Sequence, residues 1–236
     1  MTCIICKSDE KVFVGEKDSY KIYQCTTCKF RFVDPLPSND ELNDYYRRNK
    51  SAPYLSKADA KVARTKKRLA RYKHLAPGNK FLDVGCNLGT GVKAAVELGF
   101  DAHGLDIDEE SVEYARGFVP EARFHAGDIS ELPESFGNFD FVYSSEMIEH
   151  LPDVHAYFAA LSKRMNKGAI LLVTTPDAGH WSVPKDFTKW FAVIPPQHLL
   201  YFTKANMRAF LKEHDIEIIK FEFDLKAGIK GIGRKL

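Results

Sequence analysis

The sequence predicts an α/β protein in which a doubly wound, mostly parallel sheet carries helices on both faces. From residue 79 onward, apolar strand-like runs alternate with helical patterns, and this alternation is typical of a parallel sheet. A glycine-containing turn joins the first run to a helical pattern, and two Cys-x-x-Cys pairs lie far upstream. We therefore expect a small cysteine module at residues 1–35, a helical connector or cap at 36–78 and the main domain at 79–236.

The main domain is expected to contain six strands with helices between them. Each strand candidate is a short run rich in apolar or β-branched residues. The predicted strands are Lys80–Val84, Ala102–Leu105, Ala122–His125, Phe139–Tyr143, Ala169–Thr174 and Glu217–Phe223, and the predicted helices start near Val92, Glu109, His155 and Thr203.

Length, composition and charge are those of an ordinary globular protein. The 236 residues accommodate one sizeable domain and a small appended module. Hydrophobic residues make up 44% of the chain and charged residues 28%, which is the usual range. Lys and Arg total 34 against 32 Asp and Glu, and this balance argues against nucleic acid or an anionic membrane as a bulk partner.

The N-terminal segment and the longest apolar run predict a cytoplasmic protein. Residues 1–10 are followed by no long apolar segment, so we expect no signal peptide. Ala169–Val173 is far too short to span a bilayer. Because thiols stay reduced in the cytoplasm, paired cysteines are interpreted as metal ligands rather than as disulfides.

The connector is polar and charged, which predicts helix. Ser38 followed by Glu41 is typical of a capping box at a helix start. A basic helical pattern follows, with its charges spread over several faces. We interpret it as a solvated helix rather than as a nucleic-acid site.

The four N-terminal cysteines predict a structural zinc site. Cys3 and Cys6 form one Cys-x-x-Cys pair and Cys25 and Cys28 form the other, at a spacing found in zinc ribbons. Zinc prefers four tetrahedral ligands, and thiolates bind it at about 2.3 Å. Four cysteine ligands leave no open position for substrate, so the predicted role is structural.

The turn after the first main-domain strand predicts a nucleotide-like cofactor site. Gly85 permits a tight strand-to-helix turn, and Gly89 permits close approach of a ligand. Asp106 ends the next strand, where a carboxylate can accept both ribose hydroxyls. Asp83 precedes the glycines, and a buried acid there suits a cationic amino-acid cofactor better than a pyrophosphate. S-adenosylmethionine is therefore favoured over a nicotinamide dinucleotide.

Five motifs in order resemble class I S-adenosylmethionine-dependent methyltransferases. They are FLDVGCNLGTG, GLDIDEESVEYAR, HAGDISELP, FDFVYSSEMIEHLPD and LLVTTPD, and the match covers about residues 79–223. The resemblance implies a Rossmann-like methyltransferase sheet and transferase activity. It also implies these cofactor-binding residues: Asp83, Gly85 and Gly89 at the methionine end, Asp106 at the ribose, Asp128 and Ile129 at the adenine, Ser144 and Ser145 facing the methyl-bearing sulfur, and Cys86 and Ile107 beside them.

Two features depart from that family pattern. Asn87 replaces the middle glycine of the first motif, and because Asn tolerates a left-handed conformation we expect the loop to survive. The family usually closes with an antiparallel seventh strand. After Phe223 the chain is Gly-rich, basic and weakly patterned, so we expect that strand to be missing or the chain to be shortened.

An acidic and histidine-rich segment after the fourth strand predicts the chemical site. Glu146, Glu149 and His150 would share one face of a helix, and His198 follows the fifth strand. In one mechanism, His150 or His198 is a general base. In the other, Glu146, Glu149, His150 and His198 bind a second divalent metal, as in the similar pattern of plant small-RNA and ubiquinone-pathway O-methyltransferases. A solvated acidic face with a packed histidine is the third interpretation.

Aromatic residues crowd the stretch from residue 180 to 202. Trp181, Trp190 and Phe191 can stack on a sugar or an aromatic acceptor, but packing of a cap is the interpretation that we favour.

The cysteine module joined to this domain resembles bacterial sugar and secondary-metabolite methyltransferases. The resemblance implies methyl transfer to oxygen or nitrogen of a small acceptor, glycosyl or otherwise a secondary metabolite. One alternative is an RNA methyltransferase whose ribbon docks RNA. Another is a non-catalytic binding module that keeps the fold. The sequence leaves the oligomeric state open.

Overall fold

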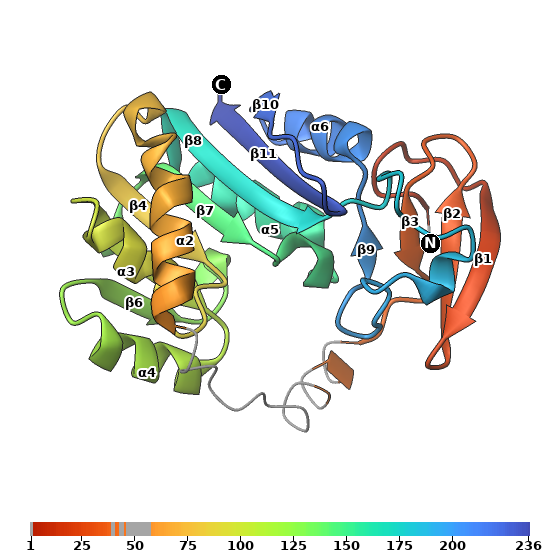
Figure 1. The fold of residues 1–236 in the computed structure, drawn as a ribbon, viewed down its shortest axis with the longest axis horizontal. Coiled ribbons are helices and arrows are strands. Elements are labelled where there is room, and N and C mark those ends of the chain that lie inside the picture. The colour runs from red at the N-terminus through yellow and green to blue at the C-terminus, as the bar shows by residue number, and fades with distance from the viewer. Residues whose placement is uncertain (1, 39–40, 43–44, 46–57) are drawn as a thin grey trace.

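A computed structural model describes residues 2–38, 41–42, 45 and 58–236 (Figure 1). Its main sheet has seven strands in the order β10-β11-β8-β7-β4-β5-β6. β4, β5, β6, β7 and β8 are parallel, and β11 pairs antiparallel with both of its neighbours. The strands are β4 (Lys80–Val84), β5 (Asp101–Asp106), β6 (Arg123–Ala126), β7 (Phe139–Ser145), β8 (Met165–Pro176), β10 (Ile216–Phe221) and β11 (Gly228–Lys235). The predicted fold class is confirmed.

Helices cover both faces of this sheet because its strands are apolar on both sides. In β4, Phe81 packs with α2, α3 and α4, whereas Leu82 and Val84 pack with α5 and α6. Within the described residues, no helix is long and apolar enough to cross a bilayer. The helices are α2 (Ala58–Ala70), α3 (Thr90–Val96), α4 (Glu109–Phe118), α5 (Val154–Lys163) and α6 (Lys204–Glu213), and the short 3-10 turns are η2 (Lys73–Leu75), η3 (Ile129–Glu131), η4 (Glu134–Phe136), η5 (Ile148–His150) and η6 (Phe187–Lys189).

The C-terminal segment forms the strand that the sequence analysis expected to be missing. β11 lies between β8 and β10, so both of its edges are hydrogen-bonded. The glycines that weakened its pattern leave room for neighbouring side chains: a Cβ at Gly233 would come within 2.7 Å of Ile216. Ile229 and Ile232 are fully buried. The prediction was wrong because two partner strands, rather than local propensity, define this segment.

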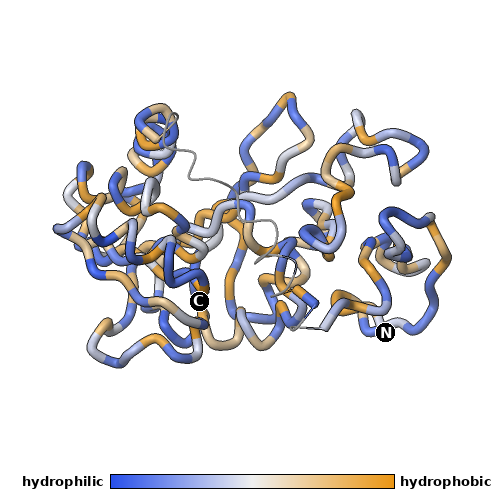
Figure 2. Tube along the Cα trace, turned by 90° about the horizontal axis from the view of Figure 1, so that it is seen from below, coloured by the Kyte–Doolittle hydropathy of each residue, from blue (hydrophilic) through white to orange (hydrophobic). Residues whose placement is uncertain are grey.

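A second sheet of four strands begins at the N-terminus, on the right of Figure 1. Its strands are β1 (Lys11–Lys17), β2 (Tyr20–Cys25), β3 (Arg31–Val33) and β9 (Leu200–Tyr201), in that order across the sheet. β9 comes from the main domain and pairs with β3 through Arg31–Tyr201 and Phe32–Leu200. Colouring by hydropathy shows apolar stretches interspersed with polar ones in both parts of the molecule (Figure 2).

The predicted connector at residues 36–78 is described only in part. The Ser38–Glu41 capping box is confirmed, with the Ser38 hydroxyl accepting from the Glu41 amide at 3.2 Å and the Glu41 carboxylate accepting from the Ser38 amide at 2.7 Å. Residues 39–40, 43–44 and 46–57 lie outside the described part. α2 then packs on α3 through Val62 and Leu69, both buried.

Candidate active site

The four N-terminal cysteines converge as the sequence predicted. Cys3 Sγ lies 3.5 Å from Cys28 Sγ, and Cys6 Sγ lies 3.4 Å from Cys25 Sγ. All four sulfur atoms lie within 4.8 Å of one another. Sulfur atoms that bind one tetrahedral zinc at about 2.3 Å are separated by slightly under 4 Å. The donor set and its spacing therefore fit a zinc ion.

The loop after β4 has the backbone conformation that a ligand-binding turn needs. Gly85 and Gly89 have φ of 74° and 78°, and Asn87 has φ of 45°. The expectation that Asn87 would accept a left-handed conformation is confirmed. The Gly85 and Cys86 amides donate to the Leu105 carbonyl, which ties the loop to β5. Cys86 itself is buried, so its side chain supports the loop from beneath.

Two acids flank this loop at the carboxyl ends of β4 and β5. Asp106 accepts from the Asn87 amide at 2.8 Å and from the Asp108 amide at 3.0 Å. Asp83 is buried and lies against α3, where any side chain at Gly91 would collide with its carboxylate. Burial, and then repulsion by Asp106, raise the pKa of Asp83 well above its ordinary value. A buried acid without a hydrogen-bond partner among the described residues is stabilised by a nearby cation.

The predicted adenine-side residues have different environments. Asp128 is the N-cap of η3, where it accepts from the Ser130 amide at 2.9 Å. Ile129 is buried in the core. Ile107, next to Asp106, is 69% exposed and presents an apolar side chain beside that carboxylate.

Tyr157 of α5 is a site residue that the sequence analysis missed. Burial, followed by the charges of Asp128, Asp106 and Asp83, raises the pKa of its phenol. The charges of three predicted site acids therefore act on this phenol. Its sequence signal is weak because Tyr157 flanks the core stripe of α5 and looks like a packing residue.

The two serines at the end of β7 are not equivalent. Ser144 is fully buried, and its hydroxyl has no hydrogen-bond partner among the described residues. The Ser145 hydroxyl lies 2.9 Å from the Thr174 hydroxyl of β8. Ser145 therefore connects the end of β7 with the end of β8.

The predicted helix bearing the acids and the histidine does not form. Glu146 has φ of 53°, which breaks the backbone after β7, and only η5 follows before α5 begins at Val154. The Thr174 hydroxyl donates to Glu146 at 2.8 Å, and the Thr175 hydroxyl donates to Glu149 at 2.9 Å. Hydrogen bonds to β8 thus hold the two carboxylates, and helical periodicity was the wrong argument for their proximity.

Glu149, His150 and His198 form one cluster, which excludes Glu146. Glu149 Oε1 lies 3.9 Å from His150 Nε2 and 3.9 Å from His198 Nε2, and the ligating atoms of all three residues lie within 4.8 Å of one another. This Oε1 is buried without a hydrogen-bond partner among the described residues. The four-residue metal set predicted from the sequence is therefore reduced to three.

The protonation of the cluster follows from its burial. Burial, and then repulsion by Glu146, raise the pKa of Glu149 to about 8. Burial, and then His198, lower the pKa of His150 to about 4. Burial also lowers the pKa of His198. Two neutral imidazoles therefore face one carboxyl group that titrates near neutral pH.

The tautomer of His198 is fixed by its second ring nitrogen. Nδ1 lies 2.7 Å from the Ala192 carbonyl, which can only accept, so Nδ1 carries the proton. The neutral ring then presents an unprotonated Nε2 toward Glu149. Such a nitrogen can accept a proton or bind a metal ion.

The cysteine module reaches this cluster through consecutive backbone hydrogen bonds. The Val33 amide donates to the Leu199 carbonyl at 2.9 Å, and the Leu199 amide donates to the Glu149 carbonyl at 2.8 Å. The Asn206 side chain donates to the Cys28 carbonyl at 3.0 Å. The residue that follows His198 is thus held between the cysteine module and Glu149.

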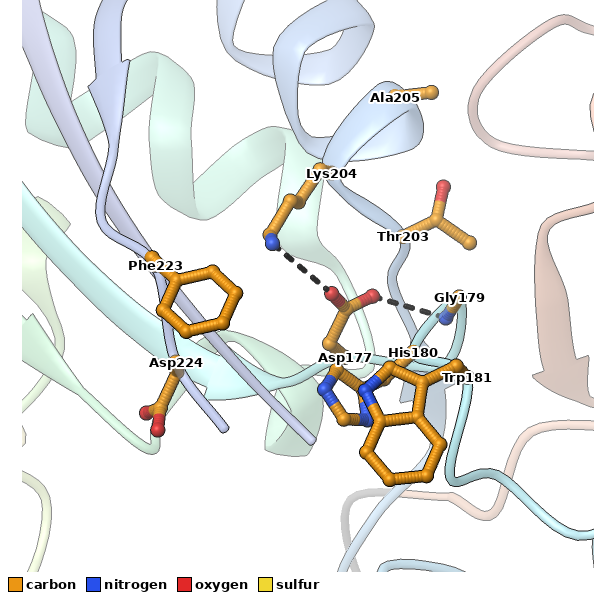
Figure 3. Close-up of a pocket in the computed structure, with 9 residues that line it drawn as sticks. All are labelled: Asp177, Gly179, His180, Trp181, Thr203, Lys204, Ala205, Phe223 and Asp224. Atoms are coloured by element: carbon orange, nitrogen blue, oxygen red, sulfur yellow. Dashed lines mark hydrogen bonds and ion pairs between the residues drawn. The ribbon is translucent and has the colours of Figure 1, made fainter. Parts of the chain in front are cut away.

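The aromatic residues of the 180–202 stretch divide into buried and exposed ones. Trp190 is 3% exposed and packs against Phe187 and Tyr201, as expected for a cap. Trp181 and Phe191 are 83% and 72% exposed. Trp181 lines a hollow at the end of β8 (Figure 3).

Comparison with known proteins identifies methyltransferases. A family model described as a methyltransferase domain matches residues 54–220. A ubiquinone biosynthesis O-methyltransferase from Bordetella avium is 31% identical over 145 residues, which are 59% of this chain and 57% of the relative. The chain thus spans just over half the length of that relative.

Solved structures share the fold. Magnesium protoporphyrin IX methyltransferase from Synechocystis PCC 6803, with bound S-adenosylhomocysteine, has a TM-score of 0.58 and 17% identity, covering 84% of this chain and 96% of that one. Mitomycin 7-O-methyltransferase has a TM-score of 0.63 and 12% identity, covering 84% and 59%.

The shifted pKa values of Glu149 and His150 predict that the stability of the protein depends on pH. Substitution of Glu149 should remove part of this dependence. The pKa of Glu149 is raised from 4.5 to about 8 on folding. Its contribution to the free energy of unfolding is therefore fully present below pH 4.5 and is lost as the pH rises through 8. The pKa of His150 is lowered from 6.5 to about 4, so its contribution is lost as the pH falls below 6.5. Between pH 6.5 and 8 only the Glu149 effect of this pair remains.

We expect the free energy of unfolding of metal-free wild type to fall by about 2 kcal/mol more than that of Glu149→Gln from pH 6.5 to 8, at about 1.4 kcal/mol per pH unit. Urea unfolding in EDTA measures this difference, with the exposed Glu134→Gln as the control. A wild-type-like slope in Glu149→Gln would show that Glu149 does not titrate in this range.

Proposed function

Because this chain belongs to the methyltransferase-domain family, we propose that it transfers a methyl group from S-adenosylmethionine to a hydroxyl oxygen or an amine nitrogen of a small acceptor. The observation that carries the proposal is the position of His198. Its unprotonated Nε2 lies beside Glu149, next to the strand end that bears Ser145. S-adenosylmethionine, when bound, supplies an electrophilic methyl group on a sulfonium.

The cofactor would lie on the β4–α3 loop, between Asp83 and Asp106. The Asp106 carboxylate accepts hydrogen bonds from two backbone amides and has lone pairs left over. It is therefore suited to accept from ribose hydroxyls. Asp83 provides a buried negative charge for the cationic methionine end, which would lower its raised pKa. Tyr157, Ile107 and the cap residue Asp128 would border the remainder.

Substitution of Asp106 tests this assignment. We expect Asp106→Ala to weaken S-adenosylhomocysteine binding by about 100-fold, because two hydrogen bonds to a charged group are lost. Asp106→Asn should be intermediate, since an amide oxygen still accepts from Asn87. Isothermal titration calorimetry measures the affinity, and Asp101→Ala, which removes a 60% exposed acid from the same strand, is the matched control. Equal binding by Asp106→Ala and wild type would refute the ribose assignment.

We propose that His198 removes the proton from the acceptor as the nucleophile attacks the methyl carbon. The Ala192 carbonyl holds the ring by Nδ1, and protonation of Nε2 would be stabilised by the neighbouring Glu149 once its carboxyl group is ionised. His150 packs against His198 with ring centroids 4.8 Å apart. Direct transfer then needs only orientation and proton removal.

A metal-assisted mechanism is the second candidate, favoured by the buried, unpartnered Glu149 Oε1. Glu149, His150 and His198 could hold a divalent cation with one oxygen and two imidazole nitrogens. Such an ion would orient the acceptor hydroxyl and lower its pKa. Glu146, bound to Thr174, would stay outside this shell.

His198→Asn separates turnover from cofactor binding. The Asn amide can still donate to the Ala192 carbonyl, but Nε2 is lost. We expect kcat to fall by 10²–10⁴-fold with S-adenosylhomocysteine affinity unchanged. Methyl transfer to an acceptor found by screening measures the loss, and His74→Asn, on the 3-10 turn η2, is the control. Wild-type activity that EDTA abolishes and a divalent metal restores would favour the metal mechanism over the general base.

We also propose that residues 1–35 form a zinc ribbon, followed by a connector at 36–78 and the methyltransferase domain at 79–236, with β9 shared between ribbon and domain. Four sulfur atoms within 4.8 Å leave no room for substrate, so zinc would be structural.

Metal analysis of the purified protein should find one zinc ion per chain. Cys25→Ser should lose the metal and unfold at lower temperature, because the ribbon has little core of its own. Cys86→Ser, outside the cluster, should retain zinc. Full zinc content in Cys25→Ser would contradict the site.

For the acceptor, we propose a sugar or another secondary metabolite. The Bordetella relative is named for O-methylation in ubiquinone biosynthesis, which is consistent with a small hydroxylated acceptor. An RNA acceptor would require a basic surface joining ribbon and pocket, and a non-catalytic module would bind no methyl donor. Acceptor screening and the calorimetric titration distinguish these alternatives.

A further inference from the structure

The hollow lies at the end of β8, the strand whose Thr175 hydroxyl donates to Glu149. Its nine lining residues come from the segment after β8, the start of α6 and the loop after β10, and its volume is about 470 Å³ (Figure 3). Thr175, which donates to Glu149, lies two residues before Asp177 in the hollow. At about 3.3 Å per residue, Thr175 and Asp177 are about 7 Å apart. A molecule that reacts at the cluster could extend into this hollow.

Two aromatic rings at the opening are left in water. Trp181 and Phe223 are each 83% exposed and come from segments more than 40 residues apart. Single exposed apolar side chains are common, but two rings beside one polar hollow offer a stacking surface. Trp181 is supported from behind by His180, with ring centroids 5.2 Å apart.

The floor of the hollow carries both donors and acceptors. Asp177 has a 5% exposed side chain, accepts from the Gly179 amide at 2.9 Å and lies 3.7 Å from Lys204 Nζ (Figure 3). His180 Nδ1 lies 2.7 Å from the Ser182 hydroxyl and 3.3 Å from the Ser182 amide, which leaves His180 Nε2 for a ligand. Asp177, Lys204 and His180 all have capacity for further hydrogen bonds.

The charges of the hollow cancel. Asp177 pairs with Lys204, and Asp224 pairs with Lys230 at 2.8 Å. A phosphate would need unpaired positive charge, and a flat aromatic acceptor would leave the further hydrogen-bonding capacity of the floor groups unused. A pyranose ring satisfies both parts, because its C–H face stacks on aromatic rings and its hydroxyls donate and accept.

We propose that this hollow binds a pyranose ring of the acceptor, with Trp181 and Phe223 as stacking surfaces and Asp177, Lys204 and His180 as partners of the sugar hydroxyls. This inference rests on the proposed methyl transfer, because it places the ring beside the Glu149 cluster. The site would set acceptor specificity and make no contact with the cofactor loop.

Saturation-transfer NMR tests the proposal with methyl glucoside, galactoside and mannoside as probes, and with hydroquinone and inorganic phosphate as competitors. We expect at least one pyranoside to bind wild type, and Trp181→Ala and Phe223→Ala to weaken that binding by about tenfold. Asp177→Asn should also weaken it while keeping the bond from Gly179. The matched control is Phe191→Ala, which removes a 72% exposed ring outside the hollow.

Four outcomes would overturn the proposal: no pyranoside binds, a pyranoside binds equally to Trp181→Ala and Phe223→Ala, Phe191→Ala is impaired as strongly, or only hydroquinone or phosphate binds. Calorimetry with S-adenosylhomocysteine on the same samples keeps the two hypotheses apart. Normal S-adenosylhomocysteine binding without a pyranoside signal refutes the sugar site alone. A pyranoside signal without S-adenosylhomocysteine binding refutes the methyl-transfer proposal instead.

Discussion

The pairing of β3 with β9 is the constraint on which the arrangement of the site depends. Two strands separated by more than 160 residues join there, and the Leu199 amide extends the hydrogen bonding to Glu149. Buried backbone groups must be paired, so neither segment can move alone without leaving donors or acceptors unsatisfied. The N-terminal cysteine module is thereby part of the framework that holds His198, and it differs from an appended module on a free linker.

Buried acids give the two halves of the site a common electrostatic character. Asp83 near the cofactor loop and Glu149 beside the histidines are both at most 4% exposed, and burial raises the pKa of each. A buried carboxylate is costly unless a cation or a proton accompanies it. One half therefore favours a positively charged ligand, and the other favours a proton or a metal ion. This arrangement matches a reaction in which a cationic donor loses its charge and an acceptor loses a proton.

β8 connects the two halves of the site because it is long and is hydrogen-bonded to a neighbouring strand on each edge. Its last residues hold Ser145, Glu146 and Glu149 through the Thr174 and Thr175 hydroxyls, and Asp177 follows at the hollow. β7 and β11 bind it on opposite sides. β11, the strand that seemed missing from the sequence, thus braces the element that carries most of the proposed acceptor side.

The sequence by itself determined the parallel core, the glycine loop with Asp83 and Asp106, the left-handed Asn87 and the four-cysteine cluster, because each depends on residue type at short spacing. Only the tertiary structure decided the remainder. β11 exists because two strands bracket a glycine-rich segment. Glu149 meets His198 through β8 and β9 rather than through helical periodicity, and the charge of Asp128 acts on Tyr157 where α5 contacts η3. Such contacts join residues far apart in the chain, and a local sequence pattern does not predict them.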